Sequence, residues 1–368
     1  MRLRIQIRKF IFLLNVLAII GLVLAHIAYW VDPKSATWPS FFGLLFPLFL
    51  LINIACTFFW LALKKRLFLY SLIVVIASAD HIGHNFQLPL FKSNLNENKM
   101  QLNLMSFNVR VFDLYNWASN EVSLQKILTF VKEQNPDIIC FQEYYYQENS
   151  AFATRDSLIK MGYAYYAEGF SKITTSGQSF GIATFSKFPI TDHVTIKFDN
   201  DNLNNALFTD VLFDNDTLRI YNAHVGSIRF SRADYNFVGI DEKTAPKHTD
   251  ESMLFTRIYE GYERRASQIE QITDHMLESP FPVVFCGDVN DTPVSATYRK
   301  LSRKLTDAFI TSGSGTGSSY ALFWLPILRI DYIMYEPEVI KTSSFTTHPV
   351  YLSDHKPISC KLSWGKRK

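Results

Sequence analysis

Ionisable side chains lie next to strongly apolar, strand-like segments near the C-terminal end of this chain. Asp288 follows the apolar run 281–286, and His355 comes just before the β-like segment 357–362. In an α/β sandwich, catalytic groups are exposed at the ends of such strands and in the adjoining loops. The two motifs therefore predict an α/β fold that carries a polar site at one edge.

The same combination of apolar and polar residues recurs upstream and between these motifs. Polar side chains end or interrupt β-like stretches at Asn108, Gln142, Glu143, Asn222, His224 and Asp331. Helix-like segments such as 121–133 alternate with these stretches. The alternation predicts a four-layer α/β sandwich, in which two facing mixed β-sheets are flanked by helices. We expect this catalytic domain at 101–366, after a polar linker at 91–100.

The chain resembles the endonuclease/exonuclease/phosphatase superfamily in the order of six motifs: Ser-Phe-Asn-Val, Phe-Gln-Glu, Asn-Ala-His-Val, Gly-Asp-Val-Asn, Ile-Asp-Tyr-Ile and Ser-Asp-His. This superfamily includes DNase I-like nucleases, neutral sphingomyelinases and inositol polyphosphate 5-phosphatases. The resemblance spans about 102–364, and the combination of motifs is specific although each is weak alone. It implies the sandwich fold and metal-assisted hydrolysis of a phosphoester.

The resemblance also implies a metal site and a group that activates water. Glu143 would bind Mg²⁺, or Mn²⁺ in its place, with Asn108 and Asp354 as further oxygen ligands. Hard oxygen ligands of this kind suit Mg²⁺, which keeps several waters. Asp288 would orient or deprotonate the attacking water, and Asn290 would hold a phosphate oxygen.

Two histidines are expected to act on the phosphoryl group. His355 would present a cationic imidazole whose charge is supported by Asp331, although swapped roles for Asp331 and Asp354 stay open. His224 matches the position of a second histidine in the nucleases and sphingomyelinases of this superfamily, which acts on the phosphate or the leaving group. Two further candidates for binding substrate are Asn222 and Arg265.

The N-terminal region, residues 1–90, is expected to be a membrane anchor. Residues 10–31 form an apolar stretch that is long enough to cross a bilayer, residues 38–63 form a second, and residues 67–84 form a shorter third. The first 99 residues contain ten basic and three acidic residues, whereas the remainder has a net charge of −4. The excess of cations therefore belongs to the anchor.

The positions of the cations predict how the anchor is oriented. Basic clusters precede residue 10 and occupy 64–66, so both are expected on the cytoplasmic side of a bacterial-type inner or plasma membrane. Three spans would place the catalytic domain on the far side of the membrane, whereas two would leave it in the cytoplasm. We favour three, because the third apolar stretch is uninterrupted up to Ala79.

These features together predict a membrane-tethered, divalent-metal-dependent phosphoester hydrolase with phosphodiesterase or nuclease-like chemistry. The alternative is a phospholipase C-like, sphingomyelinase-like or phosphomonoesterase activity, since the mildly acidic domain does not favour nucleic acid. A noncatalytic membrane receptor or scaffold is a third possibility, against which the full set of carboxylates and histidines argues. The expected partners are a phosphoester and the lipid bilayer, and no protein partner is evident.

Two segments have no settled role. Asp80, His81 and His84 have the spacing of a small metal site on one helix face, but polar residues that close a membrane helix explain them more simply. The long segment 226–263 is rich in aromatic residues, and it either covers the rim of the active site or is an insertion that adds stability.

Overall fold

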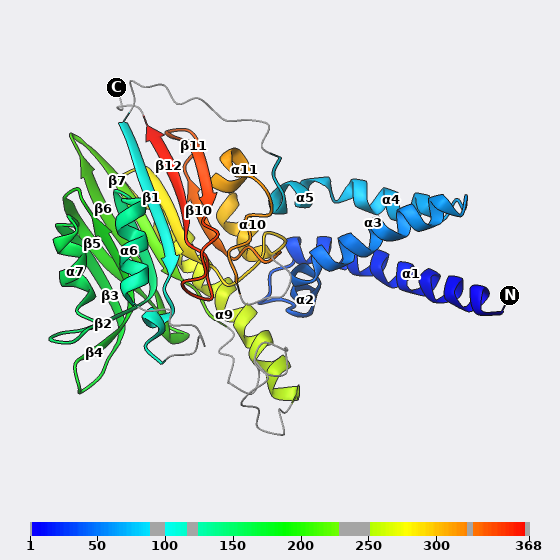
Figure 1. Ribbon diagram of the computed structural model, residues 1–368, viewed down its shortest axis with the longest axis horizontal. Helices are drawn as coiled ribbons and strands as arrows, with labels where there is room; N and C mark the ends of the chain where they lie inside the picture. Colours follow the sequence, from blue (N-terminus) through cyan, green and yellow to red (C-terminus); the bar gives the residue numbers. More distant parts are fainter. Residues whose placement is uncertain (1, 89–99, 116–123, 228–250, 322–326, 365–368) are drawn as a thin grey trace.

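The computed structural model describes residues 2–88, 100–115, 124–227, 251–321 and 327–364. The expected linker at 91–100 therefore lies almost entirely outside the described residues, as does much of the segment 226–263. An elongated helical bundle projects from one side of an α/β sandwich (Figure 1). The bundle contains α1 (Arg2–Trp30), α2 (Trp38–Leu44), α3 (Phe46–Ala62), α4 (Phe68–Ala77) and α5 (Ala79–Asn85).

Two six-stranded sheets make up the sandwich, with strand orders β11-β12-β1-β2-β4-β3 and β5-β6-β7-β8-β10-β9. The strands of the first sheet are β1 (Met100–Asn108), β2 (Ile138–Gln147), β3 (Tyr165–Ile173), β4 (Gln178–Ser186), β11 (Ile340–Thr347) and β12 (Ile358–Trp364). Those of the second are β5 (Ile190–Phe198), β6 (Asp201–Phe213), β7 (Asp216–His224), β8 (Val283–Asp288), β9 (Thr306–Asp307) and β10 (Asp331–Tyr335). Both sheets contain parallel and antiparallel pairs, as the prediction of mixed sheets requires.

The helices of the sandwich are α6 (Leu124–Gln134), α7 (Thr154–Lys160), α9 (Glu251–Leu277), α10 (Ala296–Ser302) and α11 (Ala308–Ser312), with a short 3₁₀ segment, η1, at Arg110–Asp113. The central core lies between the sheets, where Cys140 of the first sheet and Cys286 of the second belong to one buried cluster. Neighbouring residues on the same strands, Ile139 and Phe285, point outward and pack under helices on either side. The predicted four-layer sandwich is confirmed.

The strand order brings polar strand ends to one edge of the sandwich. β1 and β2 run parallel, with Asn108 beside Gln142, and β7 and β8 run parallel, with His224 beside Asp288. β10 pairs antiparallel with β8 and places Asp331 directly opposite Asp288. Because parallel strands end at the same edge, residues from distant parts of the chain meet there.

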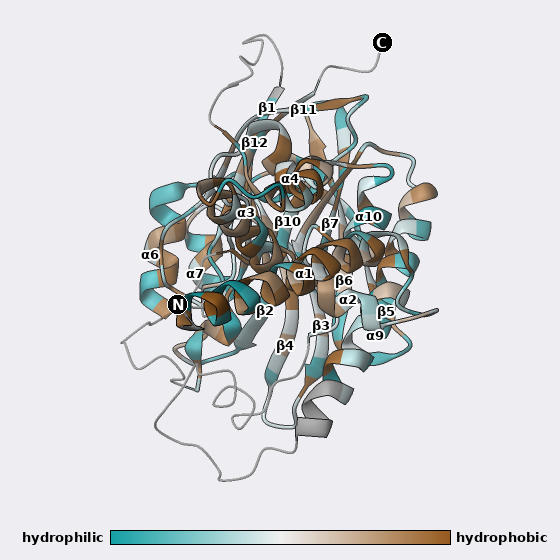
Figure 2. Cartoon of the chain, turned by 90° about the vertical axis from the view of Figure 1, so that its right-hand side faces the viewer, coloured by the Kyte–Doolittle hydropathy of each residue, from teal (hydrophilic) through white to brown (hydrophobic). Residues whose placement is uncertain are grey.

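The bundle is apolar on its outside. α1 is long and apolar enough to cross a membrane over Leu3–Trp30, and only 28% of its apolar stretch is buried against the rest of the protein. Hydrophobic residues dominate α1, α3 and α4 (Figure 2). Inside, the Asn15 amide donates to the Ser71 hydroxyl at 2.6 Å and accepts from the Trp60 indole at 3.0 Å, which joins the three helices.

The second and third apolar stretches are not single helices. The stretch 38–63 is divided at Leu45, where Pro47 lies in the first turn of α3 and could not continue a helix from α2. The stretch 67–84 is divided at Ser78, whose hydroxyl donates back to the Val74 carbonyl at 2.7 Å. α3 and α4 are apolar but shorter than α1.

The bundle is attached directly to the sandwich through the ends of its helices. Arg299 of α10 donates to the carbonyls of Tyr29 and Trp30 at the end of α1, at 2.8 and 3.2 Å. Arg329 donates to the His84 carbonyl in α5 at 2.7 Å. The last carbonyls of a helix lack hydrogen-bond partners within the helix, and these arginines donate the missing hydrogen bonds.

A loop of the sandwich also inserts into the bundle. Val294 belongs to the same buried cluster as Leu22 and Ala25 of α1 and Phe46 of α3. Gly43 in α2 passes so close to this loop that a β-carbon there would lie 2.4 Å from the Val294 carbonyl oxygen. The loop directly follows Asp288 and its neighbours, so the bundle touches the segment that holds the strand-end site.

This close approach predicts that Gly43→Ala weakens the attachment. The added methyl group meets main-chain atoms that cannot move aside alone, so we expect a loss of about 1–3 kcal/mol in the free energy of unfolding in detergent. Gly83→Ala in α5 is the matched control, because a β-carbon there has no neighbour within 4 Å. Equal stability of the two variants would contradict the observed packing.

Candidate active site

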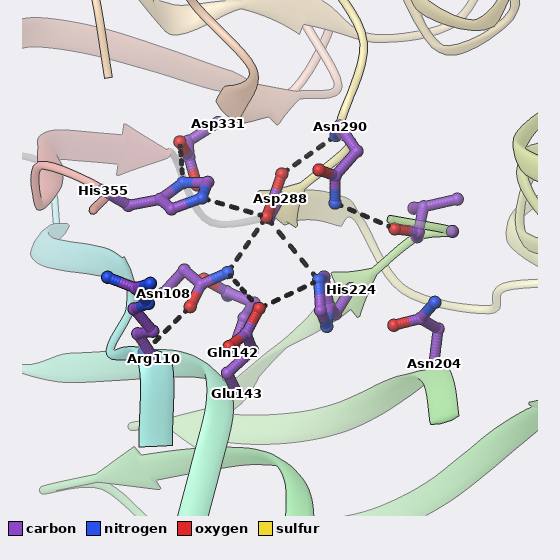
Figure 3. A network of polar contacts seen from close by, with 12 residues as sticks. Asn108, Arg110, Gln142, Glu143, Asn204, His224, Asp288, Asn290, Asp331 and His355 are labelled. Atoms are coloured by element: carbon purple, nitrogen blue, oxygen red, sulfur yellow. Dashed lines mark hydrogen bonds and ion pairs between the residues drawn. The ribbon is translucent and has the colours of Figure 1, made fainter. Parts of the chain in front are cut away.

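Asp288 lies at the centre of the polar edge, at the end of β8 (Figure 3). Its Oδ2 accepts a hydrogen bond from the Asn108 amide at 3.0 Å, and its Oδ1 accepts one from the Asn290 backbone N–H at 2.9 Å. The Nε2 atoms of His224 and His355 each lie 3.6 Å from Oδ2. Five of the predicted site residues are therefore in one cluster, to which Asn290 belongs through its backbone, since its side-chain amide donates to the Val225 carbonyl at 3.0 Å.

Gly287 explains why Asp288 can reach this position. Its φ is +152°, and a β-carbon there would lie 2.0 Å from the Ala223 carbonyl oxygen of β7. Only glycine allows the two strands to approach so closely at this point. The Gly-Asp sequence thus sets Asp288 beside the end of β7.

Burial gives Asp288 an acid–base character that suits neutral pH. Removal from water raises the pKa of Asp288 to about 6, although the positive charge of His355 opposes the rise. A carboxylate with this pKa is mostly ionised at neutral pH and still takes up a proton readily.

His355 is held in its cationic form by two carboxylates. Its Nδ1 lies 2.8 Å from Asp331 Oδ2, and both side chains are buried. Burial alone would lower the pKa of His355, but the carboxylates of Asp331 and Asp288 outweigh it and hold that pKa well above the usual value. The structure thus pairs His355 with Asp331, whereas Asp354 forms an ion pair with Arg110, Nε to Oδ2 at 3.3 Å.

His224 is the opposite case. Burial lowers the pKa of His224 more than the nearby Asp288 carboxylate raises it, so the ring is neutral at neutral pH. Its Nε2 lies 3.7 Å from Glu143 Oε1 and has no hydrogen-bond partner among the described residues. A buried polar atom without a partner is uncommon in native proteins and is well placed to contact a ligand.

Glu143 is presented by an irregularity in β2. The register between β2 and β4 shifts between Phe141 and Tyr144, and Glu143 within this bulge has a φ of +49°. Bulges re-aim side chains beside active sites, and a non-glycine residue in the left-handed region is strained. Glu143 is aimed toward the Asn108 amide, which donates to its Oε1 at 3.3 Å.

The oxygen atoms on this side of the site fit a hard divalent cation. The pKa of Glu143 is raised by its enclosed surroundings and by the nearby Asp354 carboxylate, a repulsion that a bound cation would remove. One third of the Glu143 side chain is exposed, 33%, which leaves room for a hydrated ion. Glu143 is the carboxylate best placed to hold it, because Asp354 is already paired with Arg110. Asn108 faces Glu143 with its amide nitrogen while its oxygen accepts from the Arg110 backbone N–H at 3.0 Å, so the amide has to turn before its oxygen can bind the ion.

Arg110 is a site residue that was not predicted. It begins η1, where four consecutive residues, Arg110–Asp113, have φ values of 45°, 48°, 55° and 56°. Such a left-handed run is costly for residues other than glycine, especially for β-branched Val111. Arg110 lies only two residues after Asn108 in the sequence, but no sequence pattern indicated the left-handed turn that brings it to the site.

Asn222 does not line the site, contrary to the expectation that it binds substrate. It is fully buried, accepts a hydrogen bond from the Gln142 amide at 2.7 Å, and donates to the Phe141 and Ala183 carbonyls. It therefore joins the two sheets. Asn222 and His224 are two positions apart on β7 and point to the same face, but Asn222 lies deeper between the sheets, where protein carbonyls already occupy its amide.

Arg265 is also buried rather than available to substrate. It donates to the Gly226 carbonyl at 3.0 Å, and its Nε lies 3.9 Å from Asp291 Oδ2. Gly226 follows β7 and Asp291 follows Asn290. Arg265 thus braces the two loops that extend from His224 and Asp288, and the prediction of direct binding is corrected to a supporting position.

The pKa values predict a bell-shaped pH profile. kcat/KM should fall as the pH drops through about 6, because protonated Asp288 can no longer accept a proton from water. It should fall again only on the alkaline side, where His355 loses its charge. The check is a pH–rate profile of the unaltered protein and of His193→Gln, a control variant at an exposed histidine. If kcat/KM of the two proteins does not fall near pH 6, the assignment to Asp288 is contradicted.

The site combines a buried carboxylate with one cationic and one neutral histidine. Further carboxylates lie at the neighbouring strand ends of the α/β sandwich. This is the arrangement expected of a phosphoester hydrolase. Residues 105–355 match the sequence profile of the Endonuclease/Exonuclease/phosphatase family, and the chain belongs to this family. Members of this family hydrolyse phosphoester bonds and typically depend on a divalent metal. Residues 8–85 match a domain of unknown function, DUF8431.

Solved structures share the fold at low sequence identity. An endonuclease/exonuclease/phosphatase from Bacteroides vulgatus is 18% identical with a TM-score of 0.52, over 73% of this chain and 100% of its own. One from Beutenbergia cavernae is 16% identical with a TM-score of 0.52, over 72% of each chain. D. rerio TDP2 complexed with single strand DNA product is 16% identical with a TM-score of 0.50, over 71% of this chain and 98% of its own. No curated protein matches the chain.

Proposed function

We propose that this protein is a membrane-tethered phosphodiesterase that needs a divalent metal ion and uses water to attack phosphorus. The observation that carries the proposal is the meeting of Asn108, Glu143, His224, Asp288, Asp331 and His355 at one edge of the sandwich. Few arrangements other than a catalytic site explain so many buried ionisable groups in contact.

The geometry gives each residue a distinct task. Asp288 orients the attacking water and accepts its proton, and the bond from the Asn290 backbone fixes the carboxylate. Cationic His355, aligned by Asp331, stabilises the negative charge that grows on the phosphoryl oxygens. His224 offers its unpartnered Nε2 to the phosphate or the leaving oxygen.

Glu143 and Asn108 would hold the metal ion, with Mg²⁺ as the first candidate and Mn²⁺ as the second. When bound, the ion neutralises charge on the phosphate. We expect a chelator to lower hydrolysis of a simple diester such as bis(p-nitrophenyl) phosphate by about 10²-fold or more, and Mg²⁺ or Mn²⁺ to restore it. Full activity in chelator would contradict the proposal, and binding of Mg²⁺ without any turnover would favour a noncatalytic receptor or scaffold.

The membrane tether is supported by α1. Its length, its composition and its exposed apolar surface fit a lipid environment better than the core of a soluble protein. We infer that α3 and α4 accompany it into the bilayer and that α5 lies at the membrane surface against the sandwich, with the N-terminus in the cytoplasm and the catalytic domain on the other side. Reporter fusions at the C-terminus test this; one that is active only in the cytoplasm would contradict it.

Phospholipid head groups and nucleic acids are the two candidate substrates. The attached bundle would keep the catalytic site near a lipid surface, and the acidic balance of the domain does not favour nucleic acid. Nucleic acid is the second candidate substrate because the structurally similar D. rerio TDP2 was complexed with single strand DNA product. Release of phosphorylated head groups from vesicles, measured beside cleavage of single- and double-stranded DNA, separates the two.

A further inference from the structure

A second cluster of histidine and carboxylate side chains lies away from the active site, where the bundle meets the sandwich. Asp80, His81 and His84 of α5 each offer a ligand atom, and these three atoms lie within 4.8 Å of one another. His26 of α1 lies beside them, with its ring centre 4.6 Å from that of His81. Two helices that are distant in the sequence therefore contribute to one cluster.

The cluster contains buried nitrogens with no partner. His81 is 4% exposed, and the Nδ1 atoms of His81 and His84 make no hydrogen bond to any described residue. A buried polar atom that is left unpaired costs about 1–3 kcal/mol. Polar residues that merely close an apolar helix would face water, so that simpler explanation does not account for these two nitrogens.

From this geometry we propose that Asp80, His81 and His84 bind a transition metal ion, of which Zn²⁺ is the first candidate. Imidazole nitrogens with one carboxylate suit Zn²⁺, whereas the oxygen ligands around Glu143 suit Mg²⁺. His26 is the nearest candidate for a fourth ligand, in exchange for its 2.9 Å contact with the Ser78 hydroxyl. The exposed side of Asp80 gives the ion a path from solvent.

The neighbouring cation, Arg329, already has a partner of opposite charge. Arg329 approaches through its bond to the His84 carbonyl, but its NH1 lies 2.7 Å from Asp307 Oδ2, so its charge is already paired. The ring of His84 also lies 5.4 Å from Tyr298 of α10. A bound ion would therefore fix the end of α5 at the place where it contacts the sandwich, and it would stabilise the folded protein.

The test uses the full-length protein in detergent, with its affinity tag removed and its metals stripped. Zn²⁺ binding is measured by isothermal titration, and Co²⁺ serves as a spectroscopic probe whose visible absorption reports nitrogen ligands. We expect His81→Gln and His84→Gln to weaken Zn²⁺ binding at least about 10-fold and to remove the Co²⁺ signal. Glu143→Gln, in the other site, should leave both unchanged.

Asp80→Asn provides a variant that keeps the fold, because its side chain is largely exposed, and it too should weaken Zn²⁺ binding. Zn²⁺ should also raise the melting temperature of the unaltered protein and of Glu143→Gln, but not that of His81→Gln. Zn²⁺ binding that survives all three changes in α5, or that disappears in Glu143→Gln, would overturn the proposal. These readouts do not depend on catalytic activity, so they are independent of the proposed function.

Discussion

Asp288→Asn is expected to lower kcat for a phosphodiester by about 10²–10⁴-fold, because the amide cannot accept a proton from the attacking water. The substitution keeps the shape of a side chain that is only 1% exposed, and its single amide oxygen can still accept from the Asn290 backbone, although the new NH2 group then faces the Asn108 amide without accepting from it. The measurement is steady-state hydrolysis of bis(p-nitrophenyl) phosphate with saturating Mg²⁺.

Two controls show whether the loss is chemical. Asp192→Asn makes the same change at an exposed position of β5 and should leave kcat unaltered. Asp288→Asn should still unfold cooperatively, because Asp331 keeps its bond to His355 and the loss of a carboxylate whose burial raises its pKa offsets part of the lost contacts. Near-normal kcat in Asp288→Asn would show that another group activates the water.

Arg329→Met is expected to lower the free energy of unfolding by about 3–5 kcal/mol, the usual cost of removing one partner of a buried ion pair. Arg329 is 1% exposed, and its NH1 lies 2.7 Å from Asp307 Oδ2. Without it, Asp307 keeps a buried negative charge with only the Tyr298 hydroxyl, at 3.0 Å, and nearby backbone as partners. Denaturant unfolding in detergent gives the value.

The matched control is Arg303→Met, which removes an exposed arginine and should change stability by less than about 0.5 kcal/mol. The double variant Arg329→Met/Asp307→Asn should lose less free energy of unfolding than the two single variants together, because no unpaired charge is left. Strict additivity would show that the loss comes from the contact with His84 or from packing instead.

The sequence was sufficient to predict the sandwich and the cluster around Asp288. Apolar runs marked the strands that end at Asn108, Glu143, His224 and Asp288, and the pairing of β7 with β8 sets Asp288 beside His224, whereas the packing of the two sheets brings Asn108 to Asp288. The choice of Asp331 rather than Asp354 as the partner of His355 needed the pairing of β10 with β8. Register between distant strands has no signal in one sequence.

Other features depended on local backbone geometry or on buried contacts. The bulge at Glu143 and the left-handed turn that begins at Arg110 are set by tertiary contacts and not by local preference. Asn222 and Arg265 have the residue types of a binding site, but their side chains turn inward and satisfy carbonyl groups. Sequence patterns indicate which residues of a strand or helix are polar, and not whether their side chains reach the site or turn into the protein.

The joint between α1 and α10 has an uneven chemistry. Arg299 contributes its guanidinium, whereas the end of α1 contributes the main-chain oxygens of Tyr29 and Trp30, which any amino acid would provide. The rings of these two residues also lie beside the guanidinium, with their centres 6.0 and 5.0 Å from it, so the aromatic side chains add to the joint. A chimaera with a foreign apolar helix should therefore dock best when it keeps Tyr29 and Trp30, and a shorter side chain at position 299 should loosen the end of α1 while Leu22 and Ala25 still pack against Val294.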